Sequence, residues 1–438
     1  VHHKAMKGTD MRQVIINGRL IDPANKLDEV ADLYLADDRI VGHGAKPEGF
    51  VAERTIDASG KIVIPGLIDL SARLREPGQE HKGNIASETR AAAAGGITTL
   101  CVSPDTDPII ETPAVAELII RRANDAGYAR VLPVGALTAG LKGEQLAEMG
   151  LLHQQGKCIA VSNACRPVSQ THVMRRAMEY AASCGLPVFL HAEDHSLSRG
   201  GCVHEGVMST RLGLPGLPEA AETVAVSREL MLIEQTGVRA HFCHLSATHS
   251  IQMIARAMHD GLPVTMGVTP HHLHLTEMDI GFFNSQCHVL PPLRTERDRN
   301  GLRAGLTNGY ISVICSDHQP HDPDAKLAPF ADTEPGISGL ETLLPLTLRL
   351  VTDGVVSIME ALAKVTSEPA RILNLTDSGT LASGARADIC IFDPDQPWTV
   401  IAEQLVSAGK NTPFAGWELN GKVSHTLLAG RLVYETGL

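Results

Sequence analysis

Short apolar runs recur through the middle of the chain, separated by turn residues and by stretches of helical periodicity. One unit is the run GITTLCVSP at 96–104, followed at 112–127 by TPAVAELIIRRANDAG, in which apolar positions recur every three or four residues. Six further apolar runs begin near residues 129, 156, 186, 238, 262 and 310. With an opening strand at 62–68 these make about eight strands, and their alternation with helices predicts a closed parallel (β/α)8 barrel.

Both ends of the chain have a different pattern. The first sixty or so residues carry short β-branched or alternating runs separated by turn residues, which predict a small sheet. The last part of the chain returns to such runs, and Asn420-Gly421 is a two-residue hairpin signal. Strands from both ends, separated by a barrel, most simply form one composite domain. We therefore predict a leader or tag remnant at 1–11, whose true start residue stays open, a composite β domain from 12–64 and 376–438, and a barrel at 65–375.

Composition narrows the class of protein. The 438 residues carry a formal net charge of −12 without a basic cluster, so we expect neither a nucleic-acid partner nor binding to a membrane surface. The longest apolar stretches are shorter than the roughly 18 residues that a membrane-spanning helix needs. Nine cysteines without a CxxC pair are typical of reduced, buried thiols, so we expect a cytoplasmic protein.

Histidines and acidic residues follow several predicted strands, where the catalytic groups of a parallel barrel lie. The motifs that contain them or flank them are PGLIDLSARLREPG, AAAAGGITTLCVSPDTDP, FLHAED, FCHLSA, TPHHL, PPLR, SDHQPH, PGISGLET and KNTPFAGWELNGKV. In this order they resemble the dihydroorotases of the amidohydrolase superfamily over essentially the whole chain. The resemblance implies an amidohydrolase-type TIM barrel with a small composite β-sandwich domain built from both termini.

The resemblance also implies a reaction and a metal site. Dihydroorotases close carbamoyl aspartate to dihydroorotate in pyrimidine biosynthesis, with zinc polarising the amide carbonyl and holding the hydroxide of the reverse hydrolysis. The implied ligands are a His pair after the first strand, a carboxylate or carboxylated Lys from the fourth, one His from each of the fifth and sixth, and an Asp from the eighth. Three positions match, namely His191, His244 and Asp317, and Asp317 would also be the general base.

The other implied ligand positions have lost their ligands. Ser71 and Arg73 replace the His pair, and Asn163 replaces the bridging carboxylate of the fourth strand. An arginine cannot ligate a cation, because it has no free lone pair and stays protonated at any working pH. Three of six ligands are therefore missing.

The implied substrate site is only partly kept. Arg75 matches the family's carboxylate-binding Arg, and His321 matches its substrate-contacting His. Asp105 stands where the family has a substrate-contacting Asn, and its charge would repel a dianionic substrate by about 1 to 3 kcal/mol in a partly desolvated pocket. Leu290 stands where another Asn is expected before PPLR.

Two interpretations of the remaining ligands stay open. In the first, His191, His244 and Asp317 hold one weakly bound zinc, with water as the fourth ligand and Cys165 as a further candidate ligand. In the second, these three residues are inherited from an active ancestor and no cofactor binds. We favour the second, because the charge of Arg73 would lie near any cation. We expect no zinc role for His271, His272 and His274, and we assign none to Glu193 or His318.

We therefore predict a dihydroorotase-like protein without catalytic activity. The resemblance implies a structural or regulatory subunit that assembles with aspartate carbamoyltransferase as part of an oligomer. The alternative is an active zinc-dependent cyclic amidohydrolase, a dihydroorotase with a reduced metal site. A metal-free scaffold similar to the structural relatives of dihydropyrimidinase is a third interpretation, which we favour less because the loops resemble those of dihydroorotases more closely.

A geometric expectation follows for the first strand. Side chains alternate along a strand, so Ser71 and Arg73 should both point into the barrel mouth, while Ala72 points toward the helices. The eighth strand is adjacent to the first in a closed barrel, which makes Asp317 the nearest expected carboxylate. We predict that Arg73 occupies the place of the lost cation and pairs with Asp317.

Overall fold

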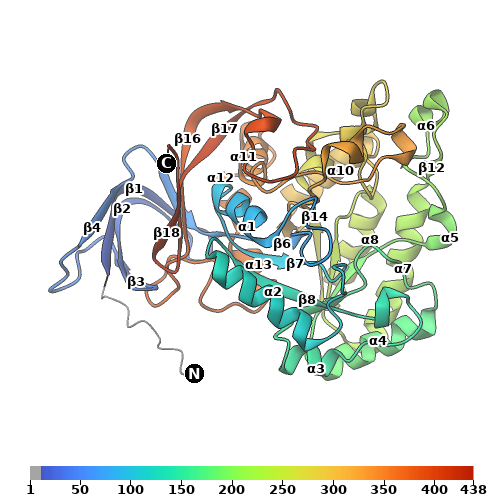
Figure 1. Cartoon of the computed structure of the whole chain (residues 1–438), viewed down its shortest axis with the longest axis horizontal. Coiled ribbons are helices and arrows are strands. Elements are labelled where there is room, and N and C mark those ends of the chain that lie inside the picture. The colour runs from blue at the N-terminus through green and yellow to red at the C-terminus, as the bar shows by residue number, and fades with distance from the viewer. Residues whose placement is uncertain (1–10, 438) are drawn as a thin grey trace.

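The computed structural model describes residues 11–437 and consists of a barrel and a sheet from both ends of the chain (Figure 1). The predicted leader at 1–11 lies, apart from Met11, outside the described residues. No helix within residues 11–437 is long and apolar enough to cross a membrane.

The barrel is the predicted parallel (β/α)8 barrel. Its strands pair in chain order, and a parallel bridge between Ala72 and His318 joins the segment after the last strand to the first. The fold class is therefore confirmed. The strands are β6 (Leu67–Ala72), β7 (Ile97–Val102), β8 (Arg130–Ala136), β9 (Ala160–Ser162), β10 (Val188–His191), β13 (Ala240–Cys243), β14 (Val264–Val268) and β15 (Val313–Ile314).

Helices connect these strands and cover the outside of the barrel. In α2, Pro113 occupies the first turn and Gly127 ends the helix in the left-handed conformation, as the sequence pattern at 112–127 predicts. The helices are α1 (Ile85–Ala94), α2 (Pro113–Ala126), α3 (Met149–Gln154), α4 (Thr171–Ser183), α5 (His195–Ser198), α6 (Val207–Leu212), α7 (Glu219–Thr236), α8 (Thr248–His259), α9 (Pro270–His274), α10 (Glu296–Thr307), α11 (Leu343–Thr352), α12 (Ile358–Ala363) and α13 (Ser367–Ile372).

Short elements lie in the loops between helices and strands, both in the barrel and, for the last of them, between two strands of the terminal sheet. They are the strand pair β11 (Val203–His204) and β12 (Gly216–Leu217), and the 3-10 turns η1 (Ala139–Leu141), η2 (Glu277–Ile280), η3 (Ser285–Cys287), η4 (Pro323–Lys326), η5 (Phe330–Asp332) and η6 (Ala402–Gln404).

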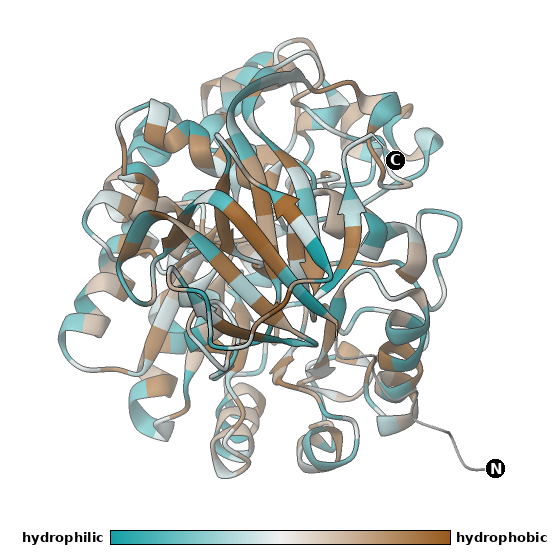
Figure 2. Cartoon of the chain, turned by 90° about the vertical axis from the view of Figure 1, so that its left-hand side faces the viewer, coloured by the Kyte–Doolittle hydropathy of each residue, from teal (hydrophilic) through white to brown (hydrophobic). Residues whose placement is uncertain are grey.

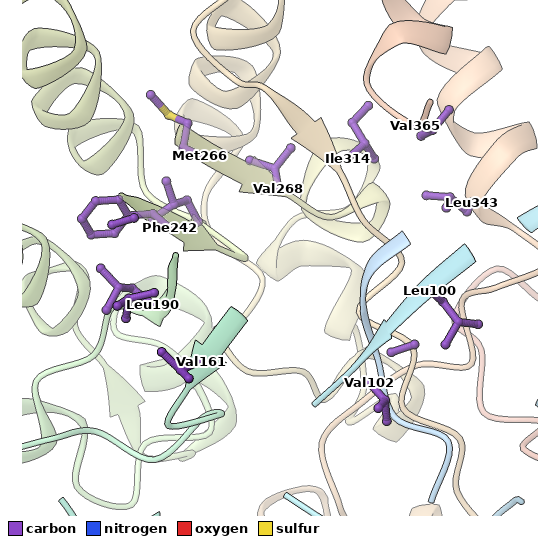
Figure 3. Packing of buried hydrophobic residues seen from close by; sticks show 14 of the residues in the cluster. Leu100, Val102, Val161, Leu190, Phe242, Met266, Val268, Ile314, Leu343 and Val365 are labelled. Carbon is purple, nitrogen blue, oxygen red and sulfur yellow. The ribbon is translucent and has the colours of Figure 1, made fainter. Parts of the chain in front are cut away.

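Side chains alternate along the barrel strands and form two cores. Figure 3 shows one set, including Leu190 and Phe242, packed in the cluster between strands and helices. Their chain neighbours Phe189 and Cys243 belong to a second cluster inside the barrel. This alternation decides which side chains reach the mouth, because inward-facing residues continue beyond the strand ends into the site.

The terminal strands form one sheet beside the barrel (Figure 2). Its order is β18-β17-β16-β5-β1-β2-β3, with β4 also paired to β1. These strands are β1 (Arg12–Asp22), β2 (Leu27–Ala36), β3 (Arg39–His43), β4 (Arg54–Asp57), β5 (Ile62–Pro65), β16 (Ile389–Thr399), β17 (Glu418–Leu428) and β18 (Arg431–Glu435).

Two details of the strand prediction were wrong. The run at 62–68 is not one strand, because Ile62–Pro65 pairs within the terminal sheet and the barrel strand begins at Leu67. Gly66 lies between them, where a Cβ would meet the Thr98 side chain. Gly421 is not at a hairpin turn but inside β17, where a Cβ would meet Leu348 of α11. The turn to β18 is at Ala429-Gly430, both with positive φ.

Candidate functional site

A small cavity lies at the C-terminal ends of the barrel strands, and we call it the mouth cavity. Its volume is about 30 Å³, enough for a water molecule. Five of its lining residues carry chemistry that the sequence singled out, namely Ser71, Arg73, Cys165, His191 and His244. The expectation that Ser71 and Arg73 point into the mouth is therefore met.

The guanidinium of Arg73 is bonded on all sides. Its Nε donates to Asp105 Oδ2 at 2.8 Å and its Nη2 to Cys165 Sγ at 3.2 Å. The predicted contact with Asp317 is present but longer, at 3.5 Å from Nη1 to Oδ1. The closest carboxylate to Arg73 is thus Asp105, which the sequence suggested only as a residue that repels substrate.

Burial and charge oppose one another in this cluster. Burial alone would lower the pKa of Arg73, but Asp105, Cys165 and Asp317 outweigh it and raise that pKa well above its ordinary value. Burial would likewise raise the pKa of Asp105, yet Arg73 holds it below its ordinary value. Arg73 is therefore a permanent cation, and Asp105 is an anion at neutral pH.

Asp317 accepts bonds from several directions. Ser71 Oγ donates to its Oδ1 at 3.4 Å, and Gln319 Nε2 donates to its Oδ2 at 3.1 Å. His244 Nε2 lies 3.5 Å from Oδ1. Asp317 has a φ of 45° and His244 a φ of 52°, a backbone conformation that non-glycine residues adopt at a cost and that recurs at functional sites.

The two site histidines lie side by side but in different electrostatic states. Their ring centroids are 6.3 Å apart. Burial lowers the pKa of His191, but Cys165 and Glu193 outweigh burial and raise it to about 9. Burial lowers the pKa of His244 to about 4. His191 is therefore protonated and His244 neutral at pH 7.

Within residues 11–437, three ring nitrogens of these histidines have no hydrogen-bond partner. They are Nδ1 of His191 and both nitrogens of His244. The Nε2 atom of His191 lies 3.3 Å from Glu193 Oε2. Unpartnered buried nitrogens cost free energy, so water or a ligand is expected at them.

Asn163 does not face the mouth cavity. Its Oδ1 accepts a bond from Thr138 Oγ1 at 2.6 Å, and its Nδ2 donates to the carbonyls of Leu141 and Arg166. The side chain thus organises the loop beyond β9. Cys165, two residues later, reaches the cavity instead.

The anion site implied by the family resemblance keeps its cation. Arg75 donates to the carbonyl of Pro320 at 2.9 Å and to Gln79 Oε1 at 3.1 Å, and its Nη2 lies 3.1 Å from His321 Nε2. Burial and the neighbouring Arg73 lower its pKa to about 10. Burial and Arg75 lower the pKa of His321 to about 3, so His321 is neutral. Leu290 is not among the residues that line the mouth cavity.

Three other histidines named from the sequence, His318, His272 and His274, make hydrogen bonds away from the mouth cavity, whereas His271 Nε2 is buried without a hydrogen-bond partner among the described residues. His318 Nε2 lies 2.9 Å from Glu88 Oε2, and its Nδ1 accepts from the backbone of Gly339. His272 bridges Thr269 and the carbonyl of Pro291. His274 Nε2 lies 2.8 Å from the carbonyl oxygen of Leu346.

The residues of the mouth do not fit a zinc ion as they stand. Arg73 donates to two of the four candidate ligands, Asp317 and Cys165. In residues 11–437, no three His, Cys, Asp or Glu side chains are grouped as a metal site requires. A cation there would also meet the charge of Arg73 at close range.

Sequence reasoning missed the pairing of Arg73 with Asp105 and the contact from Gln319. Arg73 and Asp105 follow β6 and β7, which are neighbours in the barrel. Because the two residues follow adjacent strands, the sequence contained a signal from which the Arg73–Asp105 pair could have been predicted. Gln319 follows Asp317 by two residues and lies in the SDHQPH motif, but the motif assigned it no role.

Comparisons with known proteins agree with the fold and the motifs. The model of the dihydro-orotase-like family matches residues 60–250, and that of the amidohydrolase family matches residues 337–434. A dihydroorotase-like protein of Pseudomonas putida is 50% identical over 96% of this chain and 98% of its own length. A dihydroorotase of Syntrophotalea carbinolica is 45% identical over 97% of this chain and 99% of its own.

The solved structures that resemble this chain include hydantoinases and dihydropyrimidinases. The L-hydantoinase (dihydropyrimidinase) of Arthrobacter aurescens superposes with a TM-score of 0.88 and 26% identity, covering 97% of this chain and 96% of its own. Fold, motifs and relatives agree over nearly the whole length. The chain belongs to the dihydroorotase-like family of amidohydrolases.

Proposed function

We propose that this protein is a non-catalytic member of its family in pyrimidine biosynthesis and serves as a structural or regulatory subunit with aspartate carbamoyltransferase. The observation that carries the proposal is the Arg73 guanidinium in the mouth cavity, bonded to Asp105 at 2.8 Å and to Asp317 at 3.5 Å. A fixed cation there engages the carboxylate that an active relative would use as its base.

The chemistry of the mouth argues against hydrolysis of a cyclic amide. A water molecule without an activating cation has a pKa of about 15.7, and a single carboxylate cannot convert it into an adequate nucleophile. Arg73 cannot serve as that cation, because it offers no open coordination position to water. Asp317 is already an acceptor for Ser71, Arg73 and Gln319.

The partner rests on family analogy. Dihydroorotases of this type assemble with aspartate carbamoyltransferase, and a close relative, at 50% identity, carries the name dihydroorotase-like protein rather than dihydroorotase. A subunit that no longer turns over substrate is retained when an assembly needs its surface. We expect the assembly to be an oligomer.

One observation favours a second function, that of a zinc-dependent cyclic amidohydrolase with a reduced site. His191 Nδ1 and both ring nitrogens of His244 are buried without a partner in the described part of the chain. With Asp317 they are the candidate ligands of a single zinc, which would have to draw them closer together than they lie here. A relative 45% identical to this chain is named dihydroorotase.

Two measurements on the full chain test these proposals. We expect no conversion of carbamoyl aspartate or dihydroorotate above background, with or without added zinc. A turnover near that of an ordinary enzyme, roughly 10 per second, would contradict the non-catalytic proposal. We also expect a stable complex with aspartate carbamoyltransferase from the same source by light scattering. Independent elution at micromolar concentration with unchanged carbamoyltransferase kinetics would contradict the subunit proposal.

A further inference from the structure

A second cavity opens at the end of the barrel opposite the mouth, and we call it the lower pocket. It lies where β10, β13 and β14 begin, and its volume is about 330 Å³. Sites for small organic ligands start at roughly this size, about 300 Å³. Nothing in the family's reaction uses this end of the barrel, since catalytic groups of such barrels lie at the mouth.

The charge of the lower pocket differs from that of the whole chain. Two arginines, Arg239 and Arg371, line it, and none of its lining residues is acidic, although the chain has a formal net charge of −12. Arg371 is paired with Glu368, at 2.6 Å from Nη2 to Oε2. Arg239 is therefore the positive charge of the pocket that has no acidic partner among the described residues.

The hydrogen bonds of Arg239 all go to neutral oxygens. Its Nη2 donates to the carbonyl of Gly185 at 3.1 Å. With the Asn374 amide turned so that its oxygen faces the guanidinium, that oxygen accepts from Nη1 at 2.9 Å and from Nη2 at 3.3 Å. No carboxylate within residues 11–437 is at ion-pair distance from Arg239. Arg239 is exposed, and these contacts hold its guanidinium in place without an acidic partner.

The rest of the lining suits an uncharged organic group. Leu262, Pro263 and Ile372 contribute apolar surface. Thr265 and His241 add a neutral polar pair, with 2.9 Å between Thr265 Oγ1 and His241 Nδ1. Burial lowers the pKa of His241 to about 3, so this ring adds no charge at neutral pH.

We propose that the lower pocket binds a small organic anion, namely a carboxylate or a phosphate monoester attached to an apolar body. The anionic group pairs with Arg239, with Arg371 beside it, and the body covers Leu262, Pro263 and Ile372. A guanidinium can donate two parallel hydrogen bonds to either a carboxylate or a phosphate, so the same site can bind both groups. The proposal does not depend on the subunit role argued above.

Calorimetry on the full chain at constant ionic strength tests this proposal, with phenyl phosphate, benzoate and inorganic phosphate as probes. We expect phenyl phosphate or benzoate to bind at least about threefold more tightly than inorganic phosphate, because only the first two bury apolar area. Whichever of the two binds more tightly identifies the anionic group. Arg239→Gln should weaken that binding by roughly tenfold or more, since a charge-assisted bond is lost.

Three further variants locate the ligand. Arg371→Gln should weaken binding by a smaller factor, and it also serves if Arg239→Gln fails to fold. Arg256→Gln is the matched surface control, because the Arg256 side chain is 80% exposed and lies outside the pocket; it should leave the affinity unchanged. Arg75→Gln removes the cation of the mouth and should also leave it unchanged.

Four outcomes would overturn the proposal. They are the absence of binding for every probe at millimolar concentration, equal affinity for phenyl phosphate, benzoate and inorganic phosphate, equal weakening by Arg239→Gln and Arg256→Gln, and loss of binding in Arg75→Gln with retention in Arg239→Gln. The last outcome would place the anion at the mouth.

Discussion

The mouth of the barrel has two sides that differ in how their polar groups are partnered. On the arginine side, which comprises Arg73, Asp105 and Asp317, the guanidinium bonds both carboxylates and the thiol of Cys165. On the histidine side, which comprises His191 and His244, three ring nitrogens have no partner among the described residues. The side chains of Arg73, His191 and His244 are nevertheless buried to a similar degree, at 9%, 5% and 7% exposed.

The difference shows how a barrel can keep its fold with Ser71 and Arg73 at the positions where the family resemblance implies a His pair. Two ionised carboxylates held close together, such as Asp105 and Asp317 around Arg73, repel one another unless a cation lies between them. The guanidinium of Arg73 is such a cation, and it is a side chain of the protein itself. It stands at the end of the first barrel strand, where the family resemblance implies the His pair. The histidine side needs no such replacement, because His244 is a neutral imidazole and the protonated His191 has its own carboxylate, Glu193, at 3.3 Å.

The largest effect should come from removing the central cation. We expect Arg73→Ala to lower the free energy of unfolding by about 3 to 5 kcal/mol, because Asp105 and Asp317 are left without compensation in a buried site. Urea denaturation of the wild type and the variant measures this difference. Arg256→Ala is the control, since Arg256 forms an exposed pair with Asp260 and its loss should cost less than about 1 kcal/mol. A loss of stability for Arg73→Ala no greater than that of the control would contradict the account of the arginine side.

The next effect should appear in the pH dependence of the histidine side. The folded-state pKa of His191 is raised from 6.5 to about 9. Its contribution is therefore fully present below pH 6.5 and is lost as the pH rises from 6.5 through 9, by on the order of 2 to 3 kcal/mol. Unfolding free energies of the wild type and His191→Gln at pH 6.5 and pH 9 measure this contribution.

Two controls sharpen that experiment. Cys165→Ser removes one of the groups that raise the pKa of His191 and should reduce the pH dependence in the same window. His244→Asn should not, because the pKa of His244 is lowered to about 4 and its contribution changes only below pH 6.5. Equal pH dependence of the wild type and His191→Gln between pH 6.5 and pH 9 would contradict the assignment.

Much of the fold could be predicted from the sequence, because it is encoded in local periodicity. Apolar strands followed by helical patterns predict all eight barrel strands, including one as short as Val313–Ile314. The errors at Gly66 and Gly421 have a different origin. At both positions a residue distant in the sequence comes so close that only glycine fits, namely Thr98 at Gly66 and Leu348 at Gly421. Local periodicity gives no information about such contacts.

The site could be predicted only in part. Residues that follow strands were brought to one mouth as expected, since strand ends are local features that a barrel collects at one end. The partner of each side chain was harder to predict, because it depends on rotamers and on loop backbone. Asp105 and Asp317 both lie within reach of Arg73, and only the structure distinguishes the contact at 2.8 Å from the one at 3.5 Å. The orientation of Asn163 away from the cavity depends on Thr138 and Leu141, which no motif singled out.

A smaller effect should follow from changing the histidine side itself. We expect His244→Asn to lower the free energy of unfolding at pH 7 by about 1 kcal/mol or less, because the neutral ring makes no hydrogen bond that the change would break. Asparagine also tolerates the φ of 52° at this position. Thermal and urea denaturation measure the change. A loss approaching that of Arg73→Ala would mean that the two sides of the mouth are equally important for stability.

The smallest effect should be that of a chelator, and it distinguishes the two functions proposed for the mouth. If Arg73 has taken the place of the metal, the Tm of the purified protein should change by less than about 1 °C when EDTA is added. A zinc ion at 100 times its Kd would contribute about 2.7 kcal/mol. At about 1 °C per kcal/mol for a chain of this size, its removal would lower the Tm by about 3 °C. Differential scanning calorimetry with EDTA, and again with excess zinc, measures both directions. A Tm that falls with EDTA and recovers with zinc would support the reduced zinc site of His191, His244 and Asp317, and would contradict the interpretation that Arg73 has taken the place of the metal.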